Sequence, residues 1–174
     1  MTPPSAKMCV MVGDRFCCIK IAGRANFNSS FDFKKLTTEL HSRGFNYFIL
    51  DLSECVLMDS TFLGVLTGFG LQMNPQPTGA NSGIELLNPN ARITELLGNL
   101  GVLHLFKVNT GAAPVPAGTA AVDHTPSCPT HQEVTQTCLE AHRTLMAINP
   151  DNVPRFKDVT QFLAEDLKKI KAAQ

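Results

Sequence analysis

Residues 46–71 constrain the fold most strongly, because they join a buried strand to the start of a helix. Residues 46–52 are mostly apolar and show no clean alternation of polar and apolar side chains, which is typical of a strand covered on both faces. After a short connector, Asp59 and Ser60 open a run of small and apolar residues that extends to Leu71. Asp and Ser are favoured at helix N-termini, so we expect a largely buried helix from Ser60.

The flanking segments extend this pattern. Two β-rich runs, residues 8–12 and 16–21, surround a short turn and predict an antiparallel hairpin. Phe33, Leu36 and Leu40 fall on one helical face, and Gly44 ends that helix. Further segments predict a strand at residues 83–87, a helix from Asn88 to Gly101 and a last strand at residues 102–108. This order indicates an α/β (α+β) fold, with a mixed sheet of about five strands and helices packed on it.

The C-terminal third has a different composition. Residues 109–129 are dominated by Ala, Pro, Gly and Thr, which predicts a flexible linker between residues 8–108 and residues 130–172. The last segment begins with the capping-box pattern Thr-His-Gln-Glu and contains two amphipathic stripes separated by Asn149-Pro150. We therefore expect a helical hairpin, which packs against the preceding domain, against a second copy in a homodimer, or against a partner.

Bulk composition excludes several classes of function. The chain has 15 Lys and Arg residues against 15 Asp and Glu residues, so its charge gives no support for nucleic-acid binding. No apolar run approaches the length of a membrane span, and the first residues lack the apolar stretch of a signal peptide. The expected location is therefore the cytoplasm without membrane insertion, and the six cysteines are expected to be reduced thiols.

Asp59 and Ser60 have two interpretations as residue types. In the first, they are an ordinary helix cap. In the second, the Ser60 hydroxyl lies at the electropositive end of a helix, where a phosphate group is tolerated.

Longer motifs resemble the STAS domain of the bacterial anti-sigma factor antagonists. The most specific piece is Met-Asp-Ser-Thr at residues 58–61 with Leu-Gly-Val-Leu at residues 63–66, and a second piece spans residues 86–93 with Leu-Gly-Val at residues 100–102. The resemblance covers residues 8–108. It implies a phosphoprotein in signal transduction and transcription regulation, in which Ser60 is phosphorylated by a serine kinase that is itself the anti-sigma factor. It also implies a PP2C-type phosphatase as a second partner.

The expected partner interface lies around this motif. Its members are Asp59, Ser60, Thr61, Phe62, Asn26 and Asn28. Thr61 is more often a capping or packing residue than a second phosphate acceptor. Phe62 departs from the family pattern, which usually has Gly there, and we expect it either to narrow kinase access or to contact a different partner.

Catalysis and metal binding have weaker support. No Gly-x-Ser-x-Gly elbow surrounds Ser60 and no histidine is tied to it by pattern, so the protein is not expected to be an enzyme or to use a cofactor. A Cys₂His₂ metal set is the alternative for the C-terminal segment, although its spacing matches no common zinc module. Its members are Cys128, His131, Cys138 and His142.

Two functions follow. The first is a non-catalytic regulator of a partner-switching pathway, switched by phosphorylation of Ser60. The second is a scaffold or adaptor of a signalling or membrane-transport complex that has lost the switch.

Overall fold

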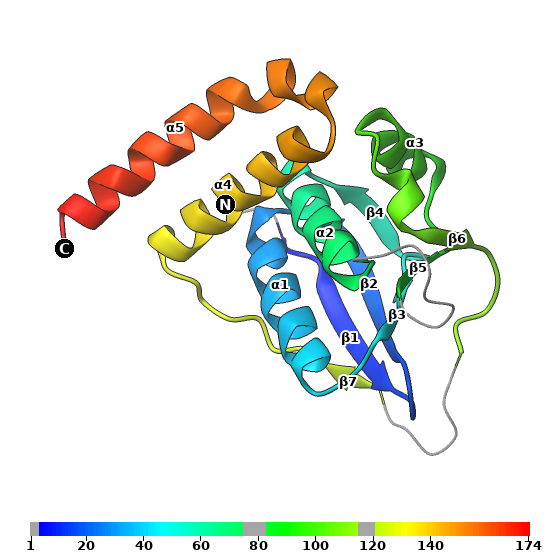
Figure 1. Ribbon diagram of the computed structural model, residues 1–174. Coiled ribbons are helices and arrows are strands. Elements are labelled where there is room, and N and C mark those ends of the chain that lie inside the picture. The colour runs from blue at the N-terminus through cyan, green and yellow to red at the C-terminus, as the bar shows by residue number, and fades with distance from the viewer. Residues whose placement is uncertain (1–3, 75–82, 115–120) are drawn as a thin grey trace.

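A mixed seven-stranded sheet forms the centre of the molecule (Figure 1). The computed structural model describes residues 4–74, 83–114 and 121–174. The strand order is β6-β5-β3-β2-β1-β7, with β4 paired to β2. The strands are β1 (Lys7–Val12), β2 (Cys17–Ala25), β3 (Tyr47–Asp51), β4 (Cys55–Met58), β5 (Gly83–Leu87), β6 (Lys107–Asn109) and β7 (Val122–Asp123). The predicted α/β class is confirmed, and the sheet has two strands more than the approximate five expected.

The predicted N-terminal hairpin is confirmed. β1 and β2 are antiparallel and pair from Lys7 opposite Ala22 to Val12 opposite Cys17. β3, β5 and β6 then add to the sheet as parallel strands. The free edge of β1 pairs with β7, which lies inside the segment predicted as a linker. The flexibility of residues 109–129 remains a prediction, but part of that segment extends the sheet.

Helices cover one face of the sheet (Figure 1). The helices are α1 (Phe27–Ser42), α2 (Ser60–Met73), α3 (Ala91–Asn99), α4 (His131–Ile148) and α5 (Val153–Ala172). Phe33 of α1 packs on Phe62 of α2 with ring centroids 5.0 Å apart, and Phe48 of β3 packs edge-on against Phe69 of α2 at 4.8 Å. These buried rings join the two helices to the sheet through apolar area.

The opposite face of the sheet carries a smaller apolar cluster. Cys18, Ile49 and Leu87 are buried there, and they are covered by partly buried side chains such as Phe16 and Tyr47. β3 is therefore buried on both faces, as its composition predicts, but helices provide the cover on only one of them.

The segment predicted as a last strand is shorter and partly helical. Gly101 has a positive φ of 73°, and a 3₁₀ turn follows at Leu103–Leu105 before β6 begins at Lys107. This turn buries Val102 and Phe106 in the main core. The apolar residues that suggested a strand are therefore explained by burial in a turn.

The C-terminal segment forms the predicted helical hairpin. Thr130 and Glu133 make the capping box that starts α4, and a 3₁₀ turn at Pro150–Asn152 leads into α5. α4 packs on α2 and α1, while α5 packs on α4 (Figure 1). Of the three expected places for the hairpin, the structure shows the preceding domain.

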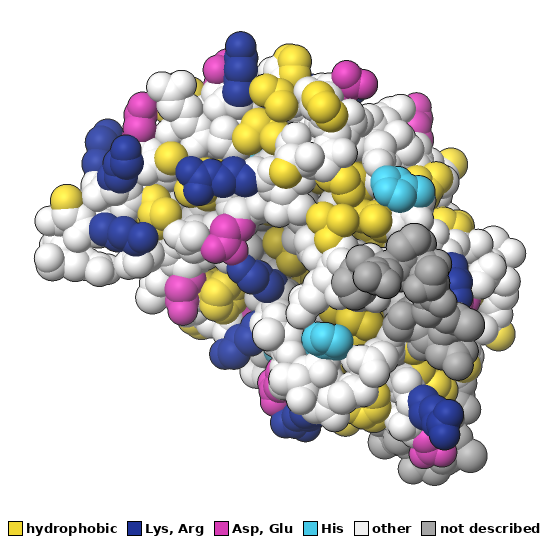
Figure 2. Space-filling model, in the orientation of Figure 1, with side chains coloured by type: hydrophobic (Ala, Val, Ile, Leu, Met, Phe, Trp, Pro, Cys, Tyr) yellow, Lys and Arg dark blue, Asp and Glu magenta, His cyan; other side chains and the backbone are white. Residues whose placement is uncertain are grey.

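The outer side of α5 combines apolar and basic side chains, which lie side by side in Figure 2. Val159 and Phe162 are exposed there. In the described ranges, no helix combines the length and the apolar character that crossing a bilayer requires.

Candidate functional site

A single carboxylate joins the start of α2 to the start of α1. Asp59 caps α2, where its Oδ1 accepts a hydrogen bond from the backbone N–H of Phe62 at 2.8 Å. Its Oδ2 accepts a hydrogen bond from the backbone N–H of Phe27 at 2.7 Å. Burial raises the pKa of Asp59, and the two backbone donors oppose that rise without cancelling it. Asp59 therefore holds two helix N-termini side by side.

Asn26 caps α1 as Asp59 caps α2. Its side-chain oxygen accepts hydrogen bonds from the backbone N–H groups of Asn28 and Ser29, and the Ser29 hydroxyl accepts one from the Asn26 backbone N–H. Asn26 and Asn28 flank Phe27, whose backbone N–H reaches Asp59 at the start of α2, and their place in a partner interface remains a prediction. The Asn26 side chain is at the same time committed to capping.

Ser60 is the first residue of α2, and its hydroxyl is bonded to a histidine of α4. The distance from Ser60 Oγ to His142 Nε2 is 2.9 Å. His142 Nδ1 lies 2.7 Å from the backbone carbonyl oxygen of Cys138. A carbonyl oxygen only accepts, so Nδ1 carries the proton in this arrangement. In the neutral imidazole, Nε2 is then the acceptor, and the Ser60 hydroxyl donates to it.

His142 is almost completely buried, with 4% of its surface exposed. Its ring lies edge-on to Phe156 of α5 with centroids 5.2 Å apart. The histidine is therefore fixed by both helices of the hairpin and by Ser60 of the domain.

α4 lies directly on the first turns of α2. A Cβ atom placed on Gly64 would lie 2.4 Å from the backbone oxygen of Ala141, so the two helices approach each other backbone to backbone. One turn earlier, the Thr61 hydroxyl donates to Cys138 Sγ at 3.6 Å. Burial raises the pKa of the Cys138 thiol. Gly64 allows this close approach because it has no side chain.

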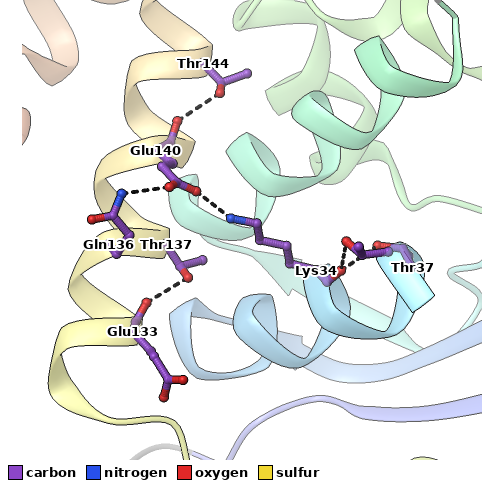
Figure 3. A network of polar contacts seen from close by, with 8 residues as sticks. Lys34, Thr37, Glu133, Gln136, Thr137, Glu140 and Thr144 are labelled. Atoms are coloured by element: carbon purple, nitrogen blue, oxygen red, sulfur yellow. Dashed lines mark hydrogen bonds and ion pairs between the residues drawn. The ribbon is translucent and has the colours of Figure 1, made fainter. Parts of the chain in front are cut away.

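An ion pair joins α4 to α1 farther from Ser60 (Figure 3). Lys34 Nζ donates to Glu140 Oε2, and the Gln136 amide donates to Glu140 Oε1. Burial raises the pKa of Glu140, but the bonds from Lys34 and Gln136 outweigh that effect and keep it below its usual value. α4 is thus held to the domain by polar contacts on both sides of the Gly64 contact.

The distance between Ser60 Oγ and His142 Nε2 lies in the range found for a serine nucleophile and its general base. The group that orients His142 is a backbone carbonyl. Among the described residues, neither Ser60 nor His142 lines the cavity between α1 and α4 or the cavity between α1, α2 and α4. The Ser60–His142 pair is a contact between α2 and α4.

The predicted role of Phe62 at a partner surface is wrong. Its side chain is 0% exposed and packs against Phe33 in the core. The helix N-terminus turns position 62 inward toward the sheet, so an aromatic ring there fills the core and neither shields Ser60 nor contacts a partner of the folded protein. Thr61 is also buried, in agreement with its expected packing role.

The four residues of the alternative metal set have separate contacts. His142 bonds to Ser60, Cys138 lies against Thr61, and His131 pairs with Asp166 of α5 at 3.2 Å. Cys128 is exposed. Within residues 4–74, 83–114 and 121–174, no group of three or more His, Cys, Asp or Glu side chains is arranged to hold a metal ion.

Sequence reasoning missed the role of His142. Its partner Ser60 is 82 residues away, and no spacing pattern connects them. The available signals were indirect: Gly64 indicated close packing on α2, and Cys138 and Ala141 indicated the buried face of α4.

Comparison with known proteins supports the fold. No protein-family model matches the chain, and no curated protein matches it. Among solved structures, a proposed anti-sigma factor antagonist from Thermotoga maritima has a TM-score of 0.51 at 20% sequence identity, covering 57% of this chain and 83% of the other.

Two structures of the anti-sigma factor antagonist SpoIIAA are also similar. The unphosphorylated form has a TM-score of 0.48 at 16% identity, covering 63% of this chain and 90% of the other. The phosphorylated form of SpoIIAA, a Bacillus cell fate determinant, has a TM-score of 0.48 at 16% identity, covering 59% of this chain and 90% of the other. The likeness to the Thermotoga maritima structure shows that this chain has the same fold as that protein, which is the fold implied by the resemblance of its motifs.

Proposed function

We propose that this protein is a non-catalytic regulator that binds a protein partner through the starts of α1 and α2 and is switched by phosphorylation of Ser60. The kinase is a serine-kinase anti-sigma factor, and a PP2C-type phosphatase reverses the modification. Transcription in a bacterial cytoplasm is the regulated process.

The observation that carries the proposal is the position of Ser60. It is the first residue of α2, directly after the capping Asp59. The unpaired N–H groups and the dipole at a helix N-terminus stabilise an added phosphate, so the domain itself tolerates the modification. The motif around Ser60 is also the part of the chain with the most specific resemblance to the STAS family.

The same phosphate would oppose a protein interface. It adds about 1.5 to 2 negative charges at neutral pH. Burying them next to the carboxylate of Asp59 without compensation costs on the order of several kcal/mol. Because each 1.4 kcal/mol is about tenfold in affinity, this cost dissolves an interface of moderate strength.

The test is phosphorylation of the purified full-length chain by a serine-kinase anti-sigma factor of the same cell, with ATP, followed by peptide mass spectrometry. We expect phosphate on Ser60, none on the Ser60→Ala variant, and unchanged modification of Thr61→Ala. We also expect Ser60→Asp to bind the kinase at least about tenfold more weakly. Absence of phosphate on Ser60 in the wild-type chain would contradict the proposal.

A specific observation favours the scaffold or adaptor as a second candidate. The Ser60 hydroxyl is already engaged by His142, and the hairpin lies on the surrounding surface. In this alternative Ser60 is a structural residue. A partner with equal affinity for the wild type, Ser60→Ala and Ser60→Asp would support the scaffold and exclude the switch.

A further inference from the structure

We infer that helix α4 masks the switch site, because a docked α4 and a phosphate on Ser60 exclude each other. Ser60 then becomes available to a kinase or a partner only when the hairpin of α4 and α5 leaves α2. The inference rests on the proposed function for the role of Ser60. The masking itself is a property of the full chain and needs no partner to be observed.

Docked α4 limits the space around the Ser60 hydroxyl. Ser60 Oγ is in hydrogen-bond contact with the buried His142, and one turn later the backbones of α2 and α4 touch at Gly64 and Ala141. Ser60 is partly exposed, but its Oγ points at the His142 ring, so the phosphorus and the three added oxygens of a phosphate on this atom would overlap the imidazole. Phosphorylation therefore requires α4 to move.

A phosphate on Ser60 would also lie next to a negative charge. Asp59 is adjacent to Ser60 and partly desolvated, and burial already raises its pKa. A phosphate on Ser60 would bring about 1.5 to 2 further negative charges next to this carboxylate. A docked α4 keeps water from both anionic groups, so a phosphate weakens the attachment of α4.

The side chains that α4 places on the domain change in kind with distance from Ser60. Near Ser60 the side chains that α4 places on the domain are small or polar, namely Cys138, Ala141 and His142. Farther from Ser60, the large apolar side chains that the hairpin adds to the main core are the buried Leu145 and the partly buried Ile148 and Phe156. The aromatic rings that join α1 and α2 to the sheet belong to the domain itself. Departure of α4 thus leaves the domain's principal core in place.

Cys138 offers a direct measurement of masking in the full-length protein. Its thiol is partly exposed but lies against Thr61 in the α2–α4 contact, so the rate of its reaction with a small maleimide rises when α4 undocks. The protein contains its own controls. Cys128 is exposed and reports unhindered labelling, while Cys17 and Cys55 are buried in the domain and report its unfolding.

Two pairs of variants test the inference by mass-spectrometric labelling rates. Ser60→Asp adds the charge, and Ser60→Ala removes only the hydrogen bond. Gly64→Ala inserts a methyl group against the Ala141 backbone. Gly68→Ala is its matched control, because a Cβ there lies 3.9 Å from the nearest atom, Thr144 Cγ2, which is ordinary contact.

We expect Ser60→Asp and Gly64→Ala to accelerate labelling of Cys138 at least about tenfold, with Ser60→Ala well below Ser60→Asp and Gly68→Ala equal to wild type. Labelling of Cys17 and Cys55 should stay unchanged. Wild-type labelling of Cys138 in both Ser60→Asp and Gly64→Ala would overturn the inference. It would also be overturned if Cys17 and Cys55 reacted together with Cys138, because the hairpin would then be inseparable from the domain. No kinase is used, so this failure is distinguishable from a missing phosphate on Ser60.

Discussion

The contacts that stabilise the domain differ in kind from the contacts that attach the C-terminal hairpin to it. Within the domain, α1 and α2 pack on the sheet through buried aromatic rings, such as Phe33 and Phe62. Between the domain and α4, the polar contacts are the Ser60–His142 hydrogen bond at the switch site and the Lys34–Glu140 ion pair farther from it, and Leu145 adds an apolar contact. The packing of buried aromatic rings does not depend on a charge added at Ser60. The Ser60–His142 hydrogen bond is lost when the hydroxyl is modified. We therefore expect a modification of Ser60 to act on the attachment of the hairpin and to leave the domain folded.

The largest effect is expected from opening a cavity in the aromatic core. Phe62→Ala removes a fully buried ring and should lower the free energy of unfolding by about 3 to 5 kcal/mol, measured by urea denaturation. Phe162→Ala is the matched control, because that ring on α5 is 71% exposed and its loss should change stability by less than about 0.5 kcal/mol. Equal losses in the two variants would show that the hairpin is part of the core.

An intermediate effect is expected at the corner of the hairpin. The buried Asn152 amide donates to the carbonyl oxygens of Leu100 in the domain, at 3.0 Å, and Leu145 in α4, at 2.9 Å. Asn152→Ala leaves both acceptors without this donor and should cost about 1 to 3 kcal/mol. Amide hydrogen exchange should rise in α4 and α5 more than in β3. The control Asn99→Ala changes an exposed side chain and should leave the exchange pattern as it is.

The smallest effect is expected from pH at Glu140. Its pKa in the folded protein is below its usual value, so its ion pair with Lys34 contributes fully at pH values above that usual value. The contribution disappears as the pH falls through the folded pKa. Both side chains are partly exposed, so we expect less than about 1 kcal/mol.

Glu140→Gln is the control for this titration. Exchange of the α4 amides in wild type should approach that of Glu140→Gln as the pH falls from 6 to about 3. Asp59 has a raised pKa and contributes in the opposite direction, since its protonated form is favoured on folding. Asp59 is present in both wild type and Glu140→Gln, so its contribution cancels in the difference between their α4 exchange rates. A constant difference between them at every pH would contradict the assignment to Glu140.

Local pattern was sufficient for most elements of the fold. The N-terminal hairpin, the helix starting at Ser60, the strand at residues 83–87 and the two C-terminal helices all follow from apolar periodicity and capping residues. The same local signals were insufficient at residues 102–108, because burial of Val102 and Phe106 in a turn resembles an apolar strand in sequence. They were also insufficient for β7, a two-residue strand whose pairing depends on the free edge of β1.

At the candidate site, the sequence by itself determined that Ser60 opens a helix and that Asp59 caps it, because capping chemistry depends on neighbouring residues. Only the tertiary structure decided that Phe62 points into the core, since its direction depends on the face that α2 presents to the sheet. Only the tertiary structure also placed His142 on Ser60, through the packing of Gly64 on Ala141. A contact between residues far apart in the chain is set by how whole helix faces fit together, and no local spacing encodes that fit.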